Sequence, residues 1–415
     1  MKKVLPILLI LALLVSCAPK PVQNAVPKPE TGKPVSLMIV GDLHYLSPTL
    51  YEEGELFERV VELGDGKVIQ YTPQILEALA EEVERVKPDG LILAGDITFN
   101  GERESHEEVA AVLKGLCSSG TKIFAIPGNH DVNYPWTYKY FGEIAQEIPS
   151  ITGSEFQNIY SLCGVAGALA LDQASCGYAF MLADDIWLLA LDANSRNTPG
   201  KLCKDTIKWM EEQLRKAKEM GVHVLSFSHQ SMIDHNIVIY EEYTVQDSPR
   251  IMGKLEDGDV FLNLSAHLHV QHIAEQEGFY DVGTGALSIY PHLYGYVEID
   301  ENRNITYTAK SLPLPEEVTT ASKALFDRTV KRRIDTALQG RDIDAETYER
   351  MSEWAIQLNN AYYRAEKIAP ELYTDRAVED WRELASDTLM GQYLLSILDE
   401  PVRDHRHLYI ERRQE

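Results

Sequence analysis

Polar side chains able to bind metal ions or move protons occur where five predicted strands end. In chain order they are Asp42 and His44, Asp96, Asn129 with His130 and Asp131, His229, and His267 with His269. Carboxylates, an amide oxygen and neutral imidazoles are the ligands that Mn²⁺, Fe²⁺ and Zn²⁺ accept in proteins. Because the carboxyl ends of strands in an open α/β sheet border the crevice where ligands bind, we expect these residues to converge.

The spacing of these residues favours two metal ions over one. Residues i and i+2 of an extended segment face the same way, so Asp42 and His44 form one pair, and His267 and His269 another. Seven of the residues are candidate ligands, namely Asp42, His44, Asp96, Asn129, His229, His267 and His269. They suit two divalent ions about 3.5–4 Å apart that share a carboxylate and a hydroxide, which attacks the phosphorus of a phosphate ester in line.

Strands and helices alternate in the part of the chain that carries the first three groups. Hydrophobic periodicity predicts strands at 35–40, 90–94 and 123–126, and helices at 72–87 and 105–116. This alternation predicts parallel pairing with helices covering the sheet. We also expect Ser105 and Glu108 to form a capping box at the start of the second helix.

The later strands come at shorter intervals. The predicted strands are 178–182, 186–191, 222–227, 260–264, 280–282, 294–299 and 305–310. The first two form a hairpin, an amphipathic helix follows at 205–220, and the last three are expected to form antiparallel meanders. In the segment 134–177 only a helix near 136–146 is predicted.

From about residue 320 onward, apolar residues recur at helical spacing. Three stripes begin at Phe326, Tyr348 and Val378, and they indicate the core contacts of a small helical cap. The segment 312–315, Leu-Pro-Leu-Pro, predicts a boundary. We therefore expect a catalytic domain over residues 35–315 and a helical domain over residues 316–415.

The N-terminus carries the features of an export signal. Lys2 and Lys3 precede an apolar stretch, residues 5–15, that is too short to span a bilayer. Residues 14–17, Leu-Val-Ser-Cys, resemble the lipobox of bacterial lipoproteins; a plain secretory signal is the alternative. The resemblance implies removal of residues 1–16 and lipidation of Cys17. A Pro-rich tether, residues 17–34, would then hold the protein on the outer face of the cytoplasmic membrane.

Charge and cysteine content exclude other classes of function. The formal net charge is −25, whereas a nucleic-acid-binding protein is expected to carry a basic stripe. The four cysteines after Cys17 lack the spacing of a metal site. In an exported chain Cys163 and Cys176 could pair, or all four could stay free.

The order of the five polar groups resembles that of the calcineurin-like metallophosphoesterases over roughly residues 35–300. This resemblance implies a four-layer αββα sandwich of mixed sheets, with the C-terminal helical cap added. It implies that Asp42, His44 and His269 hold one divalent ion, that Asn129, His229 and His267 hold the other, and that Asp96 bridges them. It also implies that His130 contacts the phosphate and is the general acid, with Asp131 orienting it.

The sequence departs from the family pattern at two positions. Ala266 stands where the family commonly has Gly, and we expect it to be tolerated. Phe99 stands where purple acid phosphatases have a ligating Tyr, which argues against their iron site. We favour phosphodiester hydrolysis, with two alternatives. One is a phosphomonoesterase acting on nucleotides, sugar phosphates or phosphoproteins, and the other is a binding lipoprotein without catalysis.

Other histidines receive structural interpretations. His106 is expected on a solvated helix face, and His235, with Asp234, in a surface loop. His272 is expected either behind the ligands or at the surface. His292 is a candidate substrate contact because it follows the Gly-rich turn 283–285.

Overall fold

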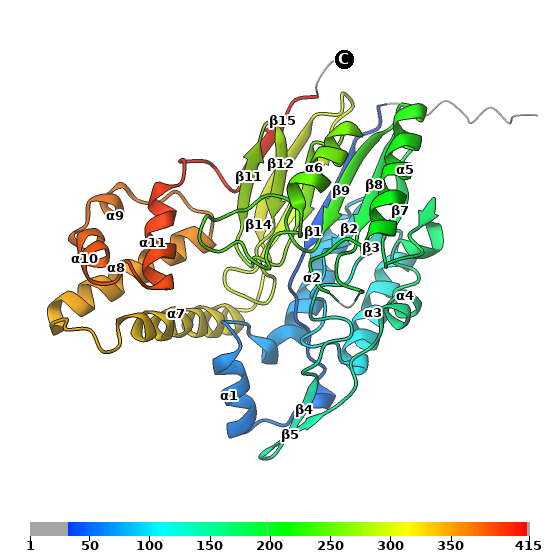
Figure 1. Ribbon diagram of the computed structural model, residues 1–415. Helices are drawn as coiled ribbons and strands as arrows, with labels where there is room; N and C mark the ends of the chain where they lie inside the picture. Colours follow the sequence, from blue (N-terminus) through cyan, green and yellow to red (C-terminus); the bar gives the residue numbers. More distant parts are fainter. Residues whose placement is uncertain (1–31, 197, 413–415) are drawn as a thin grey trace, which may run out of the picture.

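Two β-sheets stacked face to face form the centre of the protein in the computed structural model, which describes residues 32–196 and 198–412 (Figure 1). The first sheet has the order β15 (His407–Ile410), β14 (Ile305–Ser311), β13 (Leu293–Ile299), β1 (Val35–Val40), β2 (Gly90–Leu93), β3 (Lys122–Ala125). The second has the order β11 (His272–Gln276), β12 (Phe279–Gly283), β10 (Leu262–Ser265), β9 (His223–Ser228), β8 (Ile186–Leu191), β7 (Tyr178–Ala183), β6 (Ala170–Leu171).

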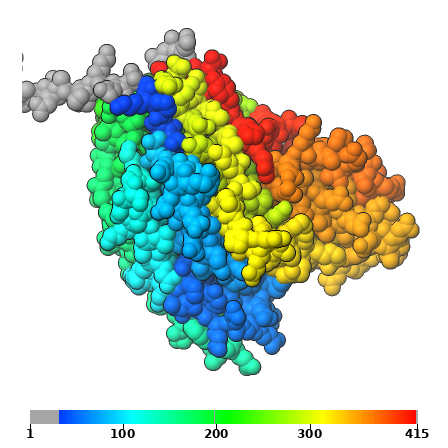
Figure 2. Space-filling view, turned by 180° about the vertical axis from the view of Figure 1, so that it is seen from behind, coloured from blue at the N-terminus to red at the C-terminus, as the bar shows by residue number. Residues whose placement is uncertain are grey.

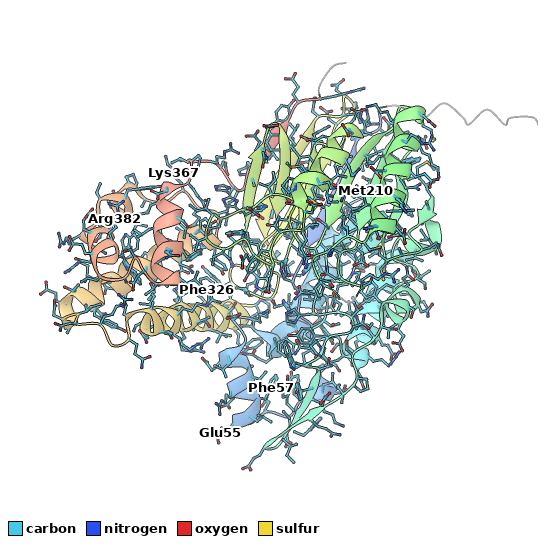
Figure 3. The ribbon with its side chains drawn as sticks, in the orientation of Figure 1. Glu55, Phe57, Met210, Phe326, Lys367 and Arg382 are labelled. Carbon is cyan, nitrogen blue, oxygen red and sulfur yellow. The ribbon has the colours of Figure 1, made fainter. Side chains whose placement is uncertain are left out.

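Helices cover the outer face of each sheet. On the first sheet these are α2 (Thr72–Val86) and α3 (Arg103–Ser118), with α4 (Gly153–Ile159) packed on α3. On the second they are α5 (Lys204–Met220) and α6 (Ser248–Asp257). Met210 of α5, labelled in Figure 3, is fully buried in this outer layer. The result is a four-layer sandwich with α, β, β and α layers, which confirms the predicted fold class.

Alternation along β1 shows why the strand is apolar throughout. Leu37 and Ile39 point into the core between the two sheets, whereas Met38 and Val40 point to the helices on the other face. Successive side chains are thus buried on opposite faces, as expected for a strand inside a covered parallel sheet. β1 pairs in parallel with β2, and β2 with β3, as the alternating pattern predicts.

Three local predictions are wrong. The segment 136–146 forms an antiparallel hairpin of β4 (Tyr138–Phe141) and β5 (Ile144–Glu147), because Gly142 adopts the left-handed conformation needed for a tight turn. Ser105 and Glu108 form no capping box; they bind the segment after β1 instead, through the Ser47 amide and the Tyr45 and Ser47 hydroxyls. Of the expected meanders only β13 and β14 pair with each other, since β12 joins the second sheet.

The C-terminal helices form a cap with its own core. They are α7 (Glu316–Leu338), α8 (Ala345–Tyr363), α9 (Pro370–Thr374), α10 (Arg376–Leu384) and α11 (Leu389–Asp399). Phe326, Met351 and Trp381, one from each predicted stripe, are buried in this core. Viewed from behind, the cap protrudes beside the sandwich (Figure 2). Among the described residues, none of the helices is long and apolar enough to cross a membrane.

After α11 the chain returns to the sandwich, where β15 pairs with β14 at the edge of the first sheet. Residues 407–410 are therefore a strand within a range predicted to be helical. A second attachment lies on α7, where Phe326 packs near Gly66 of the sandwich (Figure 3). Cys163 and Cys176 are both buried and carry free thiols.

A buried ion pair joins the turns of the two sheets. Arg303, in the β13–β14 turn, donates two hydrogen bonds of 2.7 and 2.8 Å to the carboxylate of Asp185, in the β7–β8 turn. Both residues are at most 5% exposed, so removing one partner leaves the other charge without compensation in the interior.

We expect Asp185→Ala to lower the free energy of unfolding by about 3–5 kcal/mol, because it strands the Arg303 guanidinium. Urea denaturation measures the change, and Asp184→Ala, at the exposed neighbour, is the matched control with an expected change within about 0.5 kcal/mol. The double variant Asp185→Ala, Arg303→Met should recover part of the loss; no recovery would mean that the pair is not the stabilising contact.

Candidate metal centre

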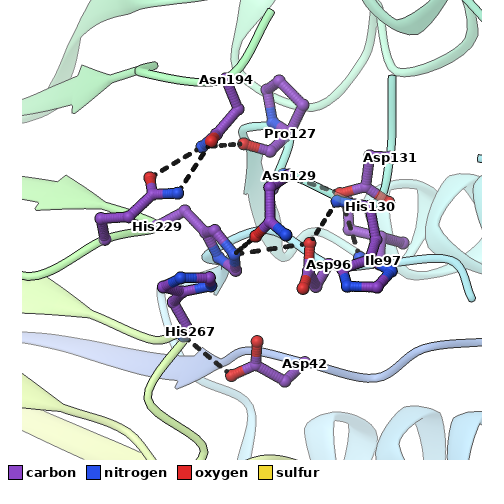
Figure 4. A network of polar contacts seen from close by, with 12 residues as sticks. Asp42, Asp96, Ile97, Pro127, Asn129, His130, Asp131, Asn194, His229 and His267 are labelled. Atoms are coloured by element: carbon purple, nitrogen blue, oxygen red, sulfur yellow. Dashed lines mark hydrogen bonds and ion pairs between the residues drawn. The ribbon is translucent and has the colours of Figure 1, made fainter. Parts of the chain in front are cut away.

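The five polar groups meet at one edge of the sandwich, where strands of both sheets end. Asp42 and His44 follow β1, Asp96 follows β2, and Asn129 with His130 follows β3. From the second sheet, His229 follows β9, and His267 with His269 follows β10. Figure 4 shows side chains from both sheets facing one another. The structure therefore brings all seven predicted ligands together.

The backbone at this edge is not extended, contrary to the expectation for the two i, i+2 pairs. Asp42, His44, Asp96, His267 and His269 all have φ between 46° and 64°, the left-handed region that residues other than Gly rarely adopt. Both members of each pair still point inward, because each adopts the same unusual conformation. Strain of this kind is retained where the surrounding structure holds it, typically at functional sites.

The first ligand group comprises Asp42, His44, Asp96 and His269, whose ligand atoms lie within 4.8 Å of one another. Nε2 of His44 lies 3.4 Å from Nε2 of His269 and 3.6 Å from Oδ2 of Asp96. Oδ1 of Asp42 is buried 3.6 Å from Nε2 of His269 and has no hydrogen-bond donor in the part of the chain that the structure describes. A buried carboxylate oxygen without a donor fits a cation at this position.

The second ligand group comprises Asp96, His229 and His267, with Asn129 beside them. Nδ1 of His229 donates to the carbonyl oxygen of Ala94 at 2.7 Å, so Nε2 faces the site. There it lies 3.0 Å from Oδ1 of Asn129 and 3.4 Å from Oδ1 of Asp96. His267 donates from Nε2 to the carbonyl oxygen of Glu242, which leaves Nδ1 as its ligand atom.

Electrostatics of the second group also favour a cation. Burial lowers the pKa of His229, but the Asp96 and Asp42 carboxylates, together with the hydrogen bond to the Ala94 carbonyl oxygen, outweigh burial and raise it to about 9. Burial opposes ionisation of Asp96, yet His229 and His130 hold its pKa well below the usual range. The protein-only site thus attracts a proton, and a divalent ion would supply that positive charge. The donor set of carboxylates, imidazoles and one amide oxygen fits such ions.

Asp96 lies between the two groups and belongs to both. Its Oδ2 faces His44, and its Oδ1 faces His229 and accepts a hydrogen bond of 2.9 Å from the His130 amide. One carboxylate with an oxygen toward each group is the arrangement that two neighbouring ions require.

His130 is held beside the first group by contacts that sequence reasoning missed. Its Nδ1 lies 3.0 Å from the carbonyl oxygen of Phe99 and 2.9 Å from Oδ1 of Asn100, so Nδ1 carries the proton. Tyr134 stacks on the ring at 4.6 Å between centroids, and the His44 ring is 5.0 Å away. Burial lowers the pKa of His130.

Asp131 does not orient His130, so that part of the prediction is wrong. Its carboxylate accepts hydrogen bonds from the amides of Ile97, Thr98 and Gly128, at 3.1, 2.9 and 2.8 Å. Asp131 therefore fastens the turn after β3 to the turn after β2. Its effect on the ligands is positional, since it holds the two turns that carry Asp96, Asn129 and His130.

Two close backbone approaches make the convergence possible. A Cβ on Gly128 would lie 2.2 Å from Oδ1 of Asp96, so any larger residue would displace the shared carboxylate. The Cβ of Ala266 lies over Gly41, where a second Cβ would be only 2.3 Å away. Ala266 is accommodated because Gly41 stands opposite.

A cavity of about 1570 Å³ opens between the metal centre and the cap. The sandwich contributes ligand residues and three aromatic residues, Tyr134, Trp136 and Tyr243, and the cap contributes α7, α8 and α11. Five cationic side chains line the cavity, against three acidic ones: Lys67, Arg196, Arg332, Arg333 and Arg341 against Asp65, Asp96 and Glu242. An acidic protein thus presents a cationic excess to its cavity.

The other polar residues considered in the sequence analysis lie outside this cavity. His235 is buried, contrary to the surface-loop expectation, and its Nδ1 lies 3.0 Å from Nδ1 of His272. His272 is also buried and contacts Glu400 at the end of the cap, so it is neither a ligand support nor a surface residue. Asp234 is exposed as expected. His292 is buried against the carbonyl oxygen of Leu287 and does not line the cavity.

His106 is buried rather than solvated, because α3 turns this side chain toward the turns. Its Nε2 lies 2.9 Å from the carbonyl oxygen of Asp131 and 3.1 Å from the Thr98 hydroxyl, and its Nδ1 lies 3.0 Å from the Tyr160 hydroxyl. Burial lowers its pKa to about 3, so the folded protein holds a neutral imidazole behind the metal centre.

We expect His106 to make the fold acid-sensitive. Its pKa is about 6.5 in the unfolded chain and about 3 when folded, so protons bind preferentially to the unfolded state below pH 6.5. Stability is complete above that pH and falls as the pH decreases toward 3, with about 2 kcal/mol lost through this residue by pH 5. Urea denaturation at pH 7 and pH 5 measures the loss. His106→Gln should flatten this dependence, whereas exposed His407→Gln should not; equal slopes in all three proteins would contradict the assignment.

Comparison with known proteins identifies the sandwich. The sequence profile of the calcineurin-like phosphoesterases matches residues 35–271, more than half of the chain. A probable cyclic nucleotide phosphodiesterase of Rhodococcus erythropolis is 24% identical over 241 residues, which cover 57% of this chain and 67% of that protein. The cap lies outside the matched profile.

Two of the solved structures similar to this chain come from Danio rerio and Staphylococcus aureus. A dimetal phosphatase from Danio rerio aligns with 68% of this chain and 97% of its own, at 11% identity and a TM-score of 0.48. A putative 5′-nucleotidase from Staphylococcus aureus aligns with 77% of this chain and 63% of its own, at 13% identity and a TM-score of 0.40. By its profile match, the chain belongs to the calcineurin-like phosphoesterase family and is a metal-dependent hydrolase of phosphate esters.

Proposed function

We propose that the protein hydrolyses a phosphodiester outside the cytoplasm with two divalent ions. Asp42, His44 and His269 would hold one ion, and Asn129, His229 and His267 the other, with Asp96 shared. The observation that carries this proposal is the position of Asp96, which directs one carboxylate oxygen toward each ligand group. When bound, the two ions would neutralise the phosphate oxygens and lower the pKa of the attacking water.

His130 would supply the proton that the leaving oxygen requires. Its Nδ1 proton is engaged by Phe99, so Nε2 is the atom free to exchange a proton with the substrate. Burial disfavours the imidazolium in the free protein, but an anionic phosphate beside the ring would raise the pKa and favour protonation. His130 would thereby become a general acid when substrate is bound.

A diester is preferred to a monoester because of what the ligand turns lack. None of the five turns, residues 41–44, 95–102, 127–135, 228–232 and 265–270, contains an arginine. A phosphate monoester is a dianion, and its recognition would call for a pair of arginines near these turns. The name of the Rhodococcus erythropolis relative, probable cyclic nucleotide phosphodiesterase, supports the same choice. A monoesterase or a non-catalytic binding protein would be recognised by the assay below.

The leaving group distinguishes the roles of His130 and the ligands. We expect His130→Ala to lower kcat about 10²–10⁴-fold on 3′,5′-cyclic AMP, whose alkoxide needs a proton, and much less on bis-p-nitrophenyl phosphate. Asn129→Ala should lower both activities alike, because it removes a metal ligand. The measurements are steady-state kinetics with added Mn²⁺ and metal content by mass spectrometry, on a fragment that starts at Lys33.

His407→Ala, at an exposed residue of β15, is the control and should behave as wild type. Preference for p-nitrophenyl phosphate would indicate a monoesterase. Equal losses on both diesters in His130→Ala would show that His130 is not the general acid. A protein that purifies without metal, and that shows no turnover with added Mn²⁺, would be a binding protein.

We further propose that lipidated Cys17 anchors the protein on the outer face of the bacterial cytoplasmic membrane. Cys17 and the tether up to residue 31 lie outside the described residues, and the support is the lipobox sequence alone. Cells fed labelled palmitate should label the full-length protein, and Cys17→Ser should abolish labelling and leave the protein unprocessed or soluble. Membrane association without label would indicate attachment by another route.

A further inference from the structure

Lys67 is a buried cation beside the metal centre, in the loop between α1 (Glu55–Leu63) and α2. The residue is only 7% exposed and lines the cavity. Among the described residues, its ammonium group makes no hydrogen bond and no ion pair; its backbone amide alone is bonded, to the carbonyl oxygen of Gly64. Burying an ammonium without a partner costs free energy, so the position calls for an anion.

Lys67 shares a cavity with the residues proposed to act on the phosphate. It lines this cavity together with His130, Asp96 and His269. The next residue, Val68, is bonded to Ser288, whose hydroxyl donates to the carbonyl oxygen of Asp42. The loop that carries Lys67 is thus connected to the turn of a proposed ligand.

Among the described residues, the Asp65 carboxylate forms its ion pair with the cap rather than with Lys67. Arg333 of α7 binds Oδ1 of Asp65 at 2.8 Å, and Arg332 donates to the carbonyl oxygen of Glu62 at 2.7 Å. On the other side, the amide of Val68 donates to the carbonyl oxygen of Ser288 at 3.0 Å. The loop is braced from both ends, so Lys67 is held in place without a partner of its own.

Charge balance argues against a purely structural role. With two divalent ions bound, the centre carries more positive charge than Asp42 and Asp96 neutralise, and it repels a nearby ammonium group. An anion between the lysine and the ions would relieve this repulsion. Phosphate is such an anion, and lysine binds it as a compact point charge.

We propose that Lys67 binds a non-bridging oxygen of the substrate phosphate, on the side away from the metal ligands. This assignment rests on the proposed phosphoesterase function and adds a substrate-binding residue to it. It also gives the cap a role in the reaction, because α7 holds the loop that presents Lys67.

The test compares Lys67→Met and Lys67→Arg with Lys114→Met, at an exposed lysine of α3. We expect Lys67→Met to lower kcat/KM for bis-p-nitrophenyl phosphate about 10- to 100-fold, the effect of one hydrogen bond to a charged group. The inhibition constant of inorganic phosphate should rise by a similar factor. Lys67→Arg should retain part of the catalytic efficiency and part of the phosphate affinity, and Lys114→Met should match wild type in both.

Two further readouts separate binding from structure. Metal content should stay unchanged in Lys67→Met, and Tm should stay equal or rise, because an unpaired buried charge is removed. Unchanged phosphate inhibition would overturn the proposal, and so would a loss of affinity accompanied by metal loss and a lower Tm. If wild type hydrolyses no ester, calorimetric titration of inorganic phosphate into wild type and Lys67→Met still decides the role of Lys67, separately from the proposed function.

Discussion

The structure depends on the packing of hydrogen-bond acceptors around Asp96. Nε2 of His44 and Nε2 of His229 lie 3.6 and 3.4 Å from the two oxygens of Asp96, and Nε2 of His229 lies 3.0 Å from Oδ1 of Asn129. This packing is unfavourable unless positive charge lies among these atoms. The protein holds this arrangement with left-handed backbone at the ligands, with Gly128 pressed against the shared carboxylate, and with Asp131 fastening two turns. The left-handed backbone costs stability and is retained because the surrounding structure enforces it.

Stacking two sheets is what makes such a site possible. Strands β1, β2 and β3 run in parallel, and so do β9 and β10, so both sheets bring their carboxyl ends to one edge. The core between the sheets sets the separation of the two sets of ligand turns. A buried ion pair of Arg303 with Asp185 joins the sheets elsewhere, between the β13–β14 turn and the β7–β8 turn. Ligands more than 200 residues apart in the sequence thereby become neighbours, as His44 and His269 show.

Hydrophobic period and residue order were sufficient to predict strands β1–β3, β7–β10 and β12–β14 and the convergence of the ligands, because these are local properties. The four-layer sandwich followed from the resemblance to the calcineurin-like metallophosphoesterases. The sequence was insufficient where tertiary contacts decide. His106 lies on an amphipathic helix, but only the packing of α3 shows which face is buried. The hairpin at 138–147 depends on one left-handed glycine, Gly142. The return of β15 depends on its pairing with β14, which lies far back along the chain. Asp131 was predicted beside His130 by adjacency, whereas backbone amides compete for its carboxylate.

Lys67 illustrates the same limit for function. In the sequence it is one lysine in a polar loop, and only the fold shows that it is buried, unpaired among the described residues and on the cavity that His130 also lines. Its environment also depends on the cap, because Arg333 binds the carboxylate of Asp65. A helical appendage outside the matched family profile thus determines the charge that the cavity presents to a substrate. Binding of a phosphate between Lys67 and the ligand groups would therefore be coupled energetically to docking of α7, so that catalytic centre and cap act as one unit.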